Sequence, residues 1–149
     1  MERLWPAARG EYGARFMVRD VPRRMDSLAA LVDFVREFLA AEKLSEDVAF
    51  DMDLVLEELF TNLVRHGRGE GSIQVELSRA PGEVRIRLRA AEPSPFDPTA
   101  APRVNVNIPM EERRAGGLGI HFVRELCSIF RYEWTDGVGT TLVVMGVTD

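Results

Sequence analysis

Apolar residues recur every three or four positions in two long stretches of the chain. The first stretch, residues 28–39, predicts an amphipathic helix that begins at Asp26 or Ser27 and ends near residue 43. The second predicts a helix from about residue 46 to 65, capped at its start by Ser45 and closed by a left-handed Gly67. Each helix has one apolar stripe and therefore requires a surface to bury it.

Strand patterns surround these helices. Alternating or short apolar runs predict strands at residues 14–21, 72–78, 84–90 and 140–147. The turn sequence Ala80-Pro-Gly-Glu83 joins the second and third of these as a hairpin, and Gly137-Val-Gly139 is typical of a hairpin turn into the last strand. Residues 118–130 predict a third helix. Such a mixture of helices and strands predicts an α+β fold, a two-layer α/β sandwich.

Composition and charge narrow the class of protein. A chain of 149 residues with 46% hydrophobic and 29% charged residues fits one globular domain, 1–149, in which residues 1–12 form a loose arm. Its net charge of −5 argues against direct nucleic-acid binding. A single cysteine, Cys127, excludes an internal disulfide. No apolar run reaches the roughly 20 residues of a membrane span, and no secretory signal is evident, so we expect a cytoplasmic protein without a membrane contact.

Two polar side chains stand out on the second helix. Glu58 and Asn62 are four residues apart and share one side of the helix. A carboxylate there can accept a hydroxyl proton, and an amide oxygen suits Mg²⁺. The alternative is a solvated helix face formed by Glu57, Glu58 and Asn62.

A glycine cluster precedes the third helix. Gly116, Gly117 and Gly119, with Leu118 between them, allow close backbone approach, and a helix N-terminus offers free N–H groups to phosphate oxygens. Arg114, just upstream, can add a charge-assisted contact. The alternative is a flexible hinge. The long, proline-rich segment from residue 92 to 117 is typical of a lid, a binding loop or a disordered stretch.

Taken in order, these features resemble the histidine-kinase-like ATPase superfamily, and most closely its bacterial anti-sigma-factor serine/threonine kinases. The matching stretches are Leu54-Val-Leu-Glu-Glu-Leu-Phe-Thr-Asn-Leu-Val-Arg-His-Gly67, Pro95-Phe-Asp-Pro98, Gly116-Gly-Leu-Gly-Ile120 and Gly139-Thr-Thr-Leu142. The resemblance implies a mixed sheet with helices on one face and ATP held beneath a lid.

The resemblance also implies residue roles and partners. It makes Glu58 the catalytic base and Asn62 the Mg²⁺ ligand, and it assigns ATP binding to Asn62, Arg114, Gly116, Gly117, Leu118, Gly119 and Thr141. It implies a homodimeric partner-switching regulator of transcription that sequesters a sigma factor and phosphorylates a serine of an anti-sigma-factor antagonist.

One departure from the family pattern concerns the base-reading motif, Asp-x-Gly. Alignment on Phe96 places Ala91 at the aspartate and Pro93 at the glycine. Loss of a hydrogen bond to a buried donor costs about 1–3 kcal/mol, which weakens ATP binding about ten- to a hundredfold. Glu92 is the adjacent acid, but neighbours in a strand face opposite sides. Glu58 and Asn62 favour a kinase, whereas Ala91 and Pro93 favour the alternative, a non-catalytic regulatory module with a degenerate nucleotide pocket.

Overall fold

A computed structural model describes residues 15–100 and 117–148 of the chain. Its elements in chain order are β1 (Arg15–Pro22), η1 (Met25–Ser27), α1 (Leu28–Glu42), α2 (Glu46–His66), β2 (Ser72–Ala80), β3 (Glu83–Ala91), η2 (Pro98–Ala100), α3 (Gly117–Leu126), β4 (Ile129–Thr135) and β5 (Val138–Gly146). The predicted loose arm and most of the proline-rich segment lie outside the described residues.

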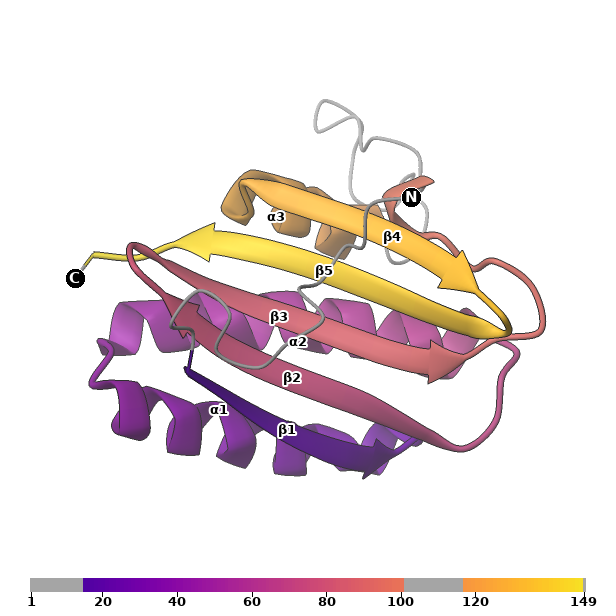
Figure 1. Cartoon of the computed structure of the whole chain (residues 1–149), viewed down its shortest axis with the longest axis horizontal. Coiled ribbons are helices and arrows are strands. Elements are labelled where there is room, and N and C mark those ends of the chain that lie inside the picture. The colour runs from indigo at the N-terminus through magenta and orange to yellow at the C-terminus, as the bar shows by residue number, and fades with distance from the viewer. Residues whose placement is uncertain (1–14, 101–116, 149) are drawn as a thin grey trace.

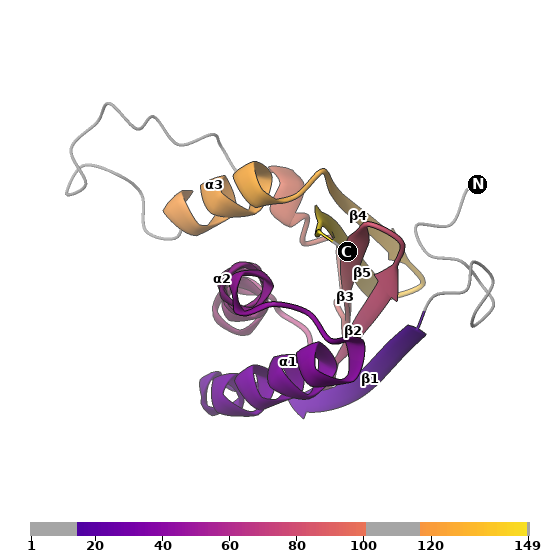
Figure 2. The same ribbon diagram turned by 90° about the vertical axis from the view of Figure 1, so that its left-hand side faces the viewer.

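The five strands form one sheet in the order β1-β2-β3-β5-β4, with the three α-helices on one face (Figures 1 and 2). The predicted two-layer α+β sandwich is therefore confirmed. The expectation of a mixed sheet is wrong for the described strands, because every neighbouring pair is antiparallel. β3 and β4 do run in the same direction, but β5 lies between them, so they never pair directly.

The core lies between the helix layer and alternate residues of the central strands. On β2 and β3 the residues that face the helices are fully or almost fully buried: Ile73, Val75, Leu77, Val84, Ile86, Leu88 and Ala90. They pack against a helix layer that includes Phe34, Phe38, Met52 and Phe60, which have no exposed surface. Burying these faces drives the two layers together, and the packing fixes the side of α2 that faces away from the sheet.

The helix starts differ from the predicted capping. Ser27 and Ser45 do occupy the N-cap positions of α1 and α2, but neither side chain makes a capping hydrogen bond. The Ser27 hydroxyl instead donates to the carbonyl oxygen of Pro22 at 2.7 Å. It therefore ties the start of α1 to the end of β1.

The helix ends differ as well. Lys43, not Gly67, takes the left-handed conformation, with φ of 55° at the end of α1. Gly67 ends α2 in an extended conformation, φ −68° and ψ 156°. A Cβ atom at Gly67 would overlap Arg23 and Glu92 side-chain atoms. Glycine is therefore needed at residue 67 for close approach and not for a positive φ.

The predicted third helix is too long, and one strand escaped the sequence analysis. α3 ends at Leu126, and the chain then turns at Cys127 and Ser128 into β4. The amide of Ser128 donates to the carbonyl oxygen of Val144 at 2.8 Å, which begins the pairing with β5. No glycine or proline marks this break in the sequence. The first apolar residues of β4 also fit the helical spacing, so the sequence pattern does not show where α3 ends.

A buried carboxylate follows the last residue of β3. Arg23, just after β1, donates from its guanidinium to Glu92, and the two side chains are only 8% and 2% exposed. The backbone amides of Arg68 and Gly69 donate to Glu92 Oε2 at 3.0 and 3.1 Å. A charge buried to this degree is tolerated because several donors surround it.

The backbone of Glu92 extends the same contact to the β4–β5 hairpin. Its amide donates to the carbonyl oxygen of Gly137 at 2.9 Å, and its carbonyl oxygen accepts a 3.0 Å hydrogen bond from Trp134 Nε1. Arg23 in turn donates to the carbonyl oxygens of Ala91 and Leu63 at 2.9 and 3.1 Å. Residues at or just after the ends of β1, α2 and β3 thus meet the β4–β5 hairpin at one point, which we call the Glu92 junction.

We predict that Gly69→Ala destabilises the fold by about 2–3 kcal/mol, because a Cβ atom there would overlap the backbone carbonyl of Ala91 at the Glu92 junction. Gly146→Ala is the matched control, since its nearest contact would be an ordinary 4.0 Å. Urea unfolding of both variants and the parent chain measures the difference. Equal free energies of unfolding for the two variants would contradict the described packing at Gly69.

Candidate functional site

The middle of α2 and the start of α3 bring two predicted site residues together. Glu58 projects from α2 toward α3, where Gly119 lies in the first turn. A Cβ atom at Gly119 would overlap the carboxyl group of Glu58, so any larger residue there would force the Glu58 side chain to move. The predicted catalytic residue and one of the predicted phosphate-binding glycines are therefore direct neighbours.

The environment of Glu58 favours its protonated form. The carboxyl group is half-buried, and burial raises its pKa above the ordinary value. A hydrogen bond from Asn62 opposes this shift, the charge of Glu57 adds to it, and Arg65 and His66 lower the pKa again. Asn62 therefore lies beside the carboxyl group, as the four-residue spacing predicts.

Two polar atoms on this part of α2 have no hydrogen-bond partner among the described residues. They are Oε1 of Glu58 and the hydroxyl oxygen of Thr61, and both are buried. Buried polar atoms in folded proteins are nearly always paired, so these two suit a polar ligand. Thr61 was missed by the sequence analysis, although it directly precedes Asn62 in the same motif.

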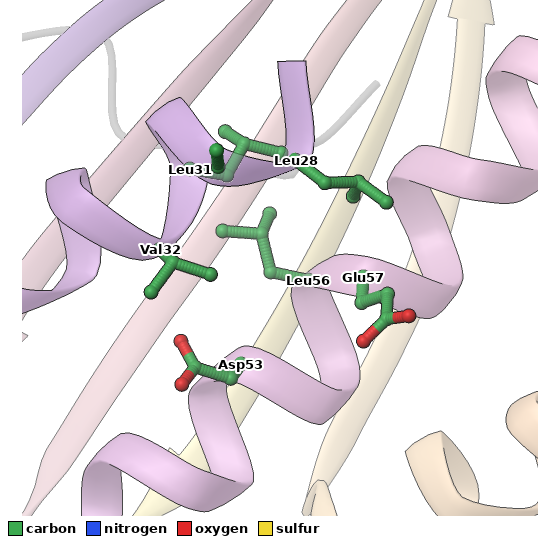
Figure 3. Close-up of a pocket in the computed structure, with 7 residues that line it drawn as sticks. Leu28, Leu31, Val32, Asp53, Leu56 and Glu57 are labelled. Atoms are coloured by element: carbon green, nitrogen blue, oxygen red, sulfur yellow. The ribbon is translucent and has the colours of Figure 1, made fainter. Parts of the chain in front are cut away.

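Glu57 lies on a different side of α2 from Glu58. It is exposed and lines a groove of about 180 Å³ between α1 and α2, with Leu28, Leu31, Val32, Asp53 and Leu56 among the other lining residues (Figure 3). The alternative of one solvated face formed by Glu57, Glu58 and Asn62 is therefore wrong: Glu57 is solvated, whereas Glu58 and Asn62 are partly buried.

The sheet contributes a hydroxyl to the helix-facing side. Thr141 on β5 is 4% exposed and pairs across the sheet with Leu88 on one side and Tyr132 on the other. The Tyr132 hydroxyl accepts a 3.0 Å hydrogen bond from the amide of Phe96. This bond ties the Pro95–Pro98 motif to the sheet near Thr141.

The sequence alignment suggests that residue 91 faces the helices and residue 92 faces away from them, and the structure shows the opposite at the end of β3. Leu88 and Ala90 face the helices and are buried, whereas Arg89 and Ala91 are exposed on the outer face of the sheet. Glu92 follows the buried set and contacts the segment after α2. The acidic side chain on the helix side of the sheet is thus Glu92, and Ala91 points away from it.

The remaining predicted site residues lie at or beyond the edge of the described chain. Arg114 and Gly116 are outside the described residues, and Gly117 and Leu118 form the first residues of α3. Residues 15–100 and 117–148 contain no group of three His, Cys, Asp or Glu side chains able to hold a metal. Asn62 can supply one oxygen to Mg²⁺, an ion that commonly takes its other ligands from phosphates and water.

Two further features bear on function. None of the helices in the described part of the chain is both long and apolar enough to cross a membrane.

Burial and, to a lesser degree, Asp51 raise the pKa of the Cys127 thiol to about 12. The thiol is therefore protonated near neutral pH and a poor nucleophile.

Comparison with solved structures shows the fold. A structure of the RsbU and RsbW domains of Rv1364c from Mycobacterium tuberculosis superposes with a TM-score of 0.62 at 17% identity, covering 91% of this chain and 33% of that one. The Acinetobacter baumannii histidine kinase AdeS gives a TM-score of 0.50 at 11% identity, covering 91% and 68%. This chain thus spans about a third of the length of the mycobacterial structure.

Sequence comparison shows the family. No curated protein sequence matches the chain significantly. The profile of the histidine kinase-like ATPase domain matches residues 21–145, which include every described element except part of β1 and the last residue of β5. By this match and by its fold, the chain belongs to the histidine kinase-like ATPase domain family.

Proposed function

We propose that the chain is an ATP- and Mg²⁺-dependent protein serine/threonine kinase that acts as an anti-sigma regulatory factor. The observation that carries the proposal is the Glu58 carboxyl group, which lies against Gly119 and has one buried oxygen, Oε1, without a partner among residues 15–100 and 117–148. Asn62 bonds this carboxyl group, but a buried oxygen that is left without a hydrogen bond costs stability. A role in the fold does not account for it, whereas a role as proton acceptor does.

In the proposed reaction, the side chains and backbone of this chain bind the nucleotide and the metal, and Glu58 accepts one proton. ATP, when bound, would transfer its γ-phosphoryl group to the serine oxygen and leave as ADP, and Mg²⁺ would neutralise part of the phosphate charge. Glu58 accepts the proton of the incoming serine hydroxyl at Oε1, which has no partner in the described part of the chain. Asn62 would supply an oxygen ligand to the metal, and the N–H groups at the start of α3, at Gly117, Leu118 and Gly119, would bind the phosphates. We assign Arg114 and Gly116 to the same phosphate-binding site, and Thr141 to the adenine-binding site.

The proposal includes the partners of such a regulator. They are a sigma factor, which the protein sequesters, and an anti-sigma-factor antagonist, whose serine it phosphorylates. We further propose a cytoplasmic homodimer that makes no direct contact with nucleic acid. The support is the order of the four motifs in the chain, together with the fold that it shares with a structure containing an RsbW domain.

A second candidate function is a non-catalytic regulatory module that keeps the fold and binds a partner with little nucleotide. One observation favours it: the acidic side chain nearest the expected base-reading position, Glu92, already accepts three hydrogen bonds within the fold. A carboxylate held in this way is a poor acceptor for a ligand. Nucleotide binding separates the two functions.

We predict that Mg²⁺–ATP binds measurably but weakly, because Glu58, Asn62 and the glycines are present while Ala91 lacks an acceptor and Glu92 is held within the fold. Calorimetric titration with Mg²⁺–ATP up to millimolar concentration, together with the thermal unfolding midpoint, measures binding. Absence of both heat and a thermal shift would reject the kinase in favour of the module.

We predict that Glu58→Gln reduces phosphoryl transfer to a serine-containing antagonist by at least about a hundredfold, since general-base catalysis contributes about 10²–10⁴. Binding of Mg²⁺–ATP and the thermal midpoint are expected to stay near their parent values. Glu57→Gln is the control, because this neighbouring carboxylate is exposed on another side of α2. Undiminished transfer by the Glu58 variant would exclude it as the base.

We predict that the transfer rate falls as the pH is lowered, with a midpoint above the ordinary glutamate value of about 4.3. A base acts in its ionised form, and burial raises the pKa of Glu58, so the loss begins at a higher pH than for an exposed glutamate. Because the charge of Glu57 also raises this pKa, Glu57→Gln is expected to shift the acid limb toward lower pH. A shift toward higher pH would be inconsistent with Glu58 as the titrating group.

A further inference from the structure

We infer that the groove between α1 and α2 is a docking site for a segment of a partner protein that presents an aliphatic side chain and, one helical turn away, an arginine or lysine. This groove lies on a different side of α2 from Glu58 (Figure 3). The proposed phosphoryl transfer does not use it, and the docking does not depend on nucleotide binding.

The groove is lined mainly by aliphatic side chains of two antiparallel helices, which only residues 43–45 connect. Leu31 and Leu56 are almost fully buried, whereas Val32 beside them is 42% exposed. The volume of about 180 Å³ exceeds the roughly 150 Å³ of a protein cavity that holds a benzene molecule. One aliphatic side chain of a partner therefore fits, and its burial would also cover Val32.

Two carboxylates lie along the α2 wall of the groove. Asp53 and Glu57 are four residues apart and therefore lie one turn apart on one side of the helix. Asp53, near Val32, accepts a 2.7 Å hydrogen bond from Arg36 of α1 (Figure 3). Glu57, near Leu28, is exposed and forms no ion pair with the described part of the chain. The available carboxylate is thus at the Leu28 end.

The surrounding charge determines which class of partner this surface attracts. Residues 28–66, which form the two helices, contain nine Asp and Glu residues but only three Arg and Lys, whereas the whole chain has 24 and 19. Such a surface attracts cations and repels anions. Nucleic acid and anionic lipid are therefore disfavoured as partners, and a protein segment with basic side chains is favoured.

The shape of the groove indicates how such a segment would bind. An amphipathic helix that docks in an apolar groove uses side chains three or four residues apart. Positions i and i+4 of a helix are neighbours on its surface, about one turn of 5.4 Å apart. A segment with an aliphatic residue at i and a basic residue at i+4 can place the first against Val32 and Leu56 and the second at Glu57.

The test is a titration of the full chain, with its methyl groups observed by NMR. The probe is an alanine-rich helical peptide that carries a leucine and, four positions later, an arginine, added to millimolar concentration at physiological ionic strength. We expect methyl signals of Leu28, Val32 and Leu56 to shift. The signals of Val18, a valine on β1 with a similar exposure of 40%, are expected to stay in place.

Matched variants separate the two contributions to binding. Glu57→Gln is expected to weaken peptide binding by up to about fivefold, the upper range for an exposed ion pair. Asp47→Asn removes an exposed carboxylate of α2 that does not line the groove, and is expected to leave binding unchanged. Val32→Ala is expected to weaken binding about threefold or more, since burial of one methylene group changes an equilibrium constant about fourfold. Val18→Ala is its control.

Each result supports or overturns the inference. Shifts confined to the groove, and weaker binding when the peptide's leucine becomes alanine or its arginine becomes glutamate, support it. No shift at millimolar peptide, shifts outside the groove, or equal binding by either altered peptide overturns it. A molecular mass that rises with protein concentration and returns to one chain in Val32→Ala overturns it as well, because a second copy then occupies the groove. No nucleotide is present, so failure here leaves the proposed kinase function untouched.

Discussion

The Glu92 junction joins the end of α2 to the sheet, which lies in the other layer of the fold. One carboxylate and its backbone take hydrogen bonds that reach β1 through Arg23, the segment after α2, and the β4–β5 hairpin. Such a charge is stable inside a protein only when its donors stay in place. The requirement extends to Gly67 and Gly69, where any side chain would overlap the junction.

The same junction orients the helix that carries the candidate site. Arg23 donates to the carbonyl oxygen of Leu63 at 3.1 Å, one residue after Asn62, as well as to Glu92. The C-terminal half of α2 is therefore fixed to the C-terminal end of β3, the central strand of the sheet. Since a helix is rigid over this length, the position of Glu58 against Gly119 follows in part from an ion pair formed elsewhere.

The site consequently has two ends of different character. Near α3, the buried oxygen of Glu58 and the hydroxyl of Thr61 have no partner in the described chain, which leaves them available to a ligand. At the end of β3, Glu92 has all the donors that it needs within the fold. Polar groups of the described chain are thus left without partners at the end proposed to bind phosphates and accept a proton. At the end where the adenine is expected, the carboxylate of Glu92 is hydrogen-bonded within the fold.

The sequence by itself determined the helices, the hairpin at residues 80–83 and the family, because periodicity, turn chemistry and the order of motifs are local properties of a chain. Only the tertiary structure decided that β4 exists, that the described strands pair antiparallel, that Glu57 and Glu58 face different surroundings, and that Glu92 rather than Ala91 faces the helices. These features depend on which distant residues meet. The sequence does not show whether an acidic residue near a strand end faces solvent or a distant partner. Glu92 pairs with a buried arginine, Arg23, that lies 69 residues away along the chain.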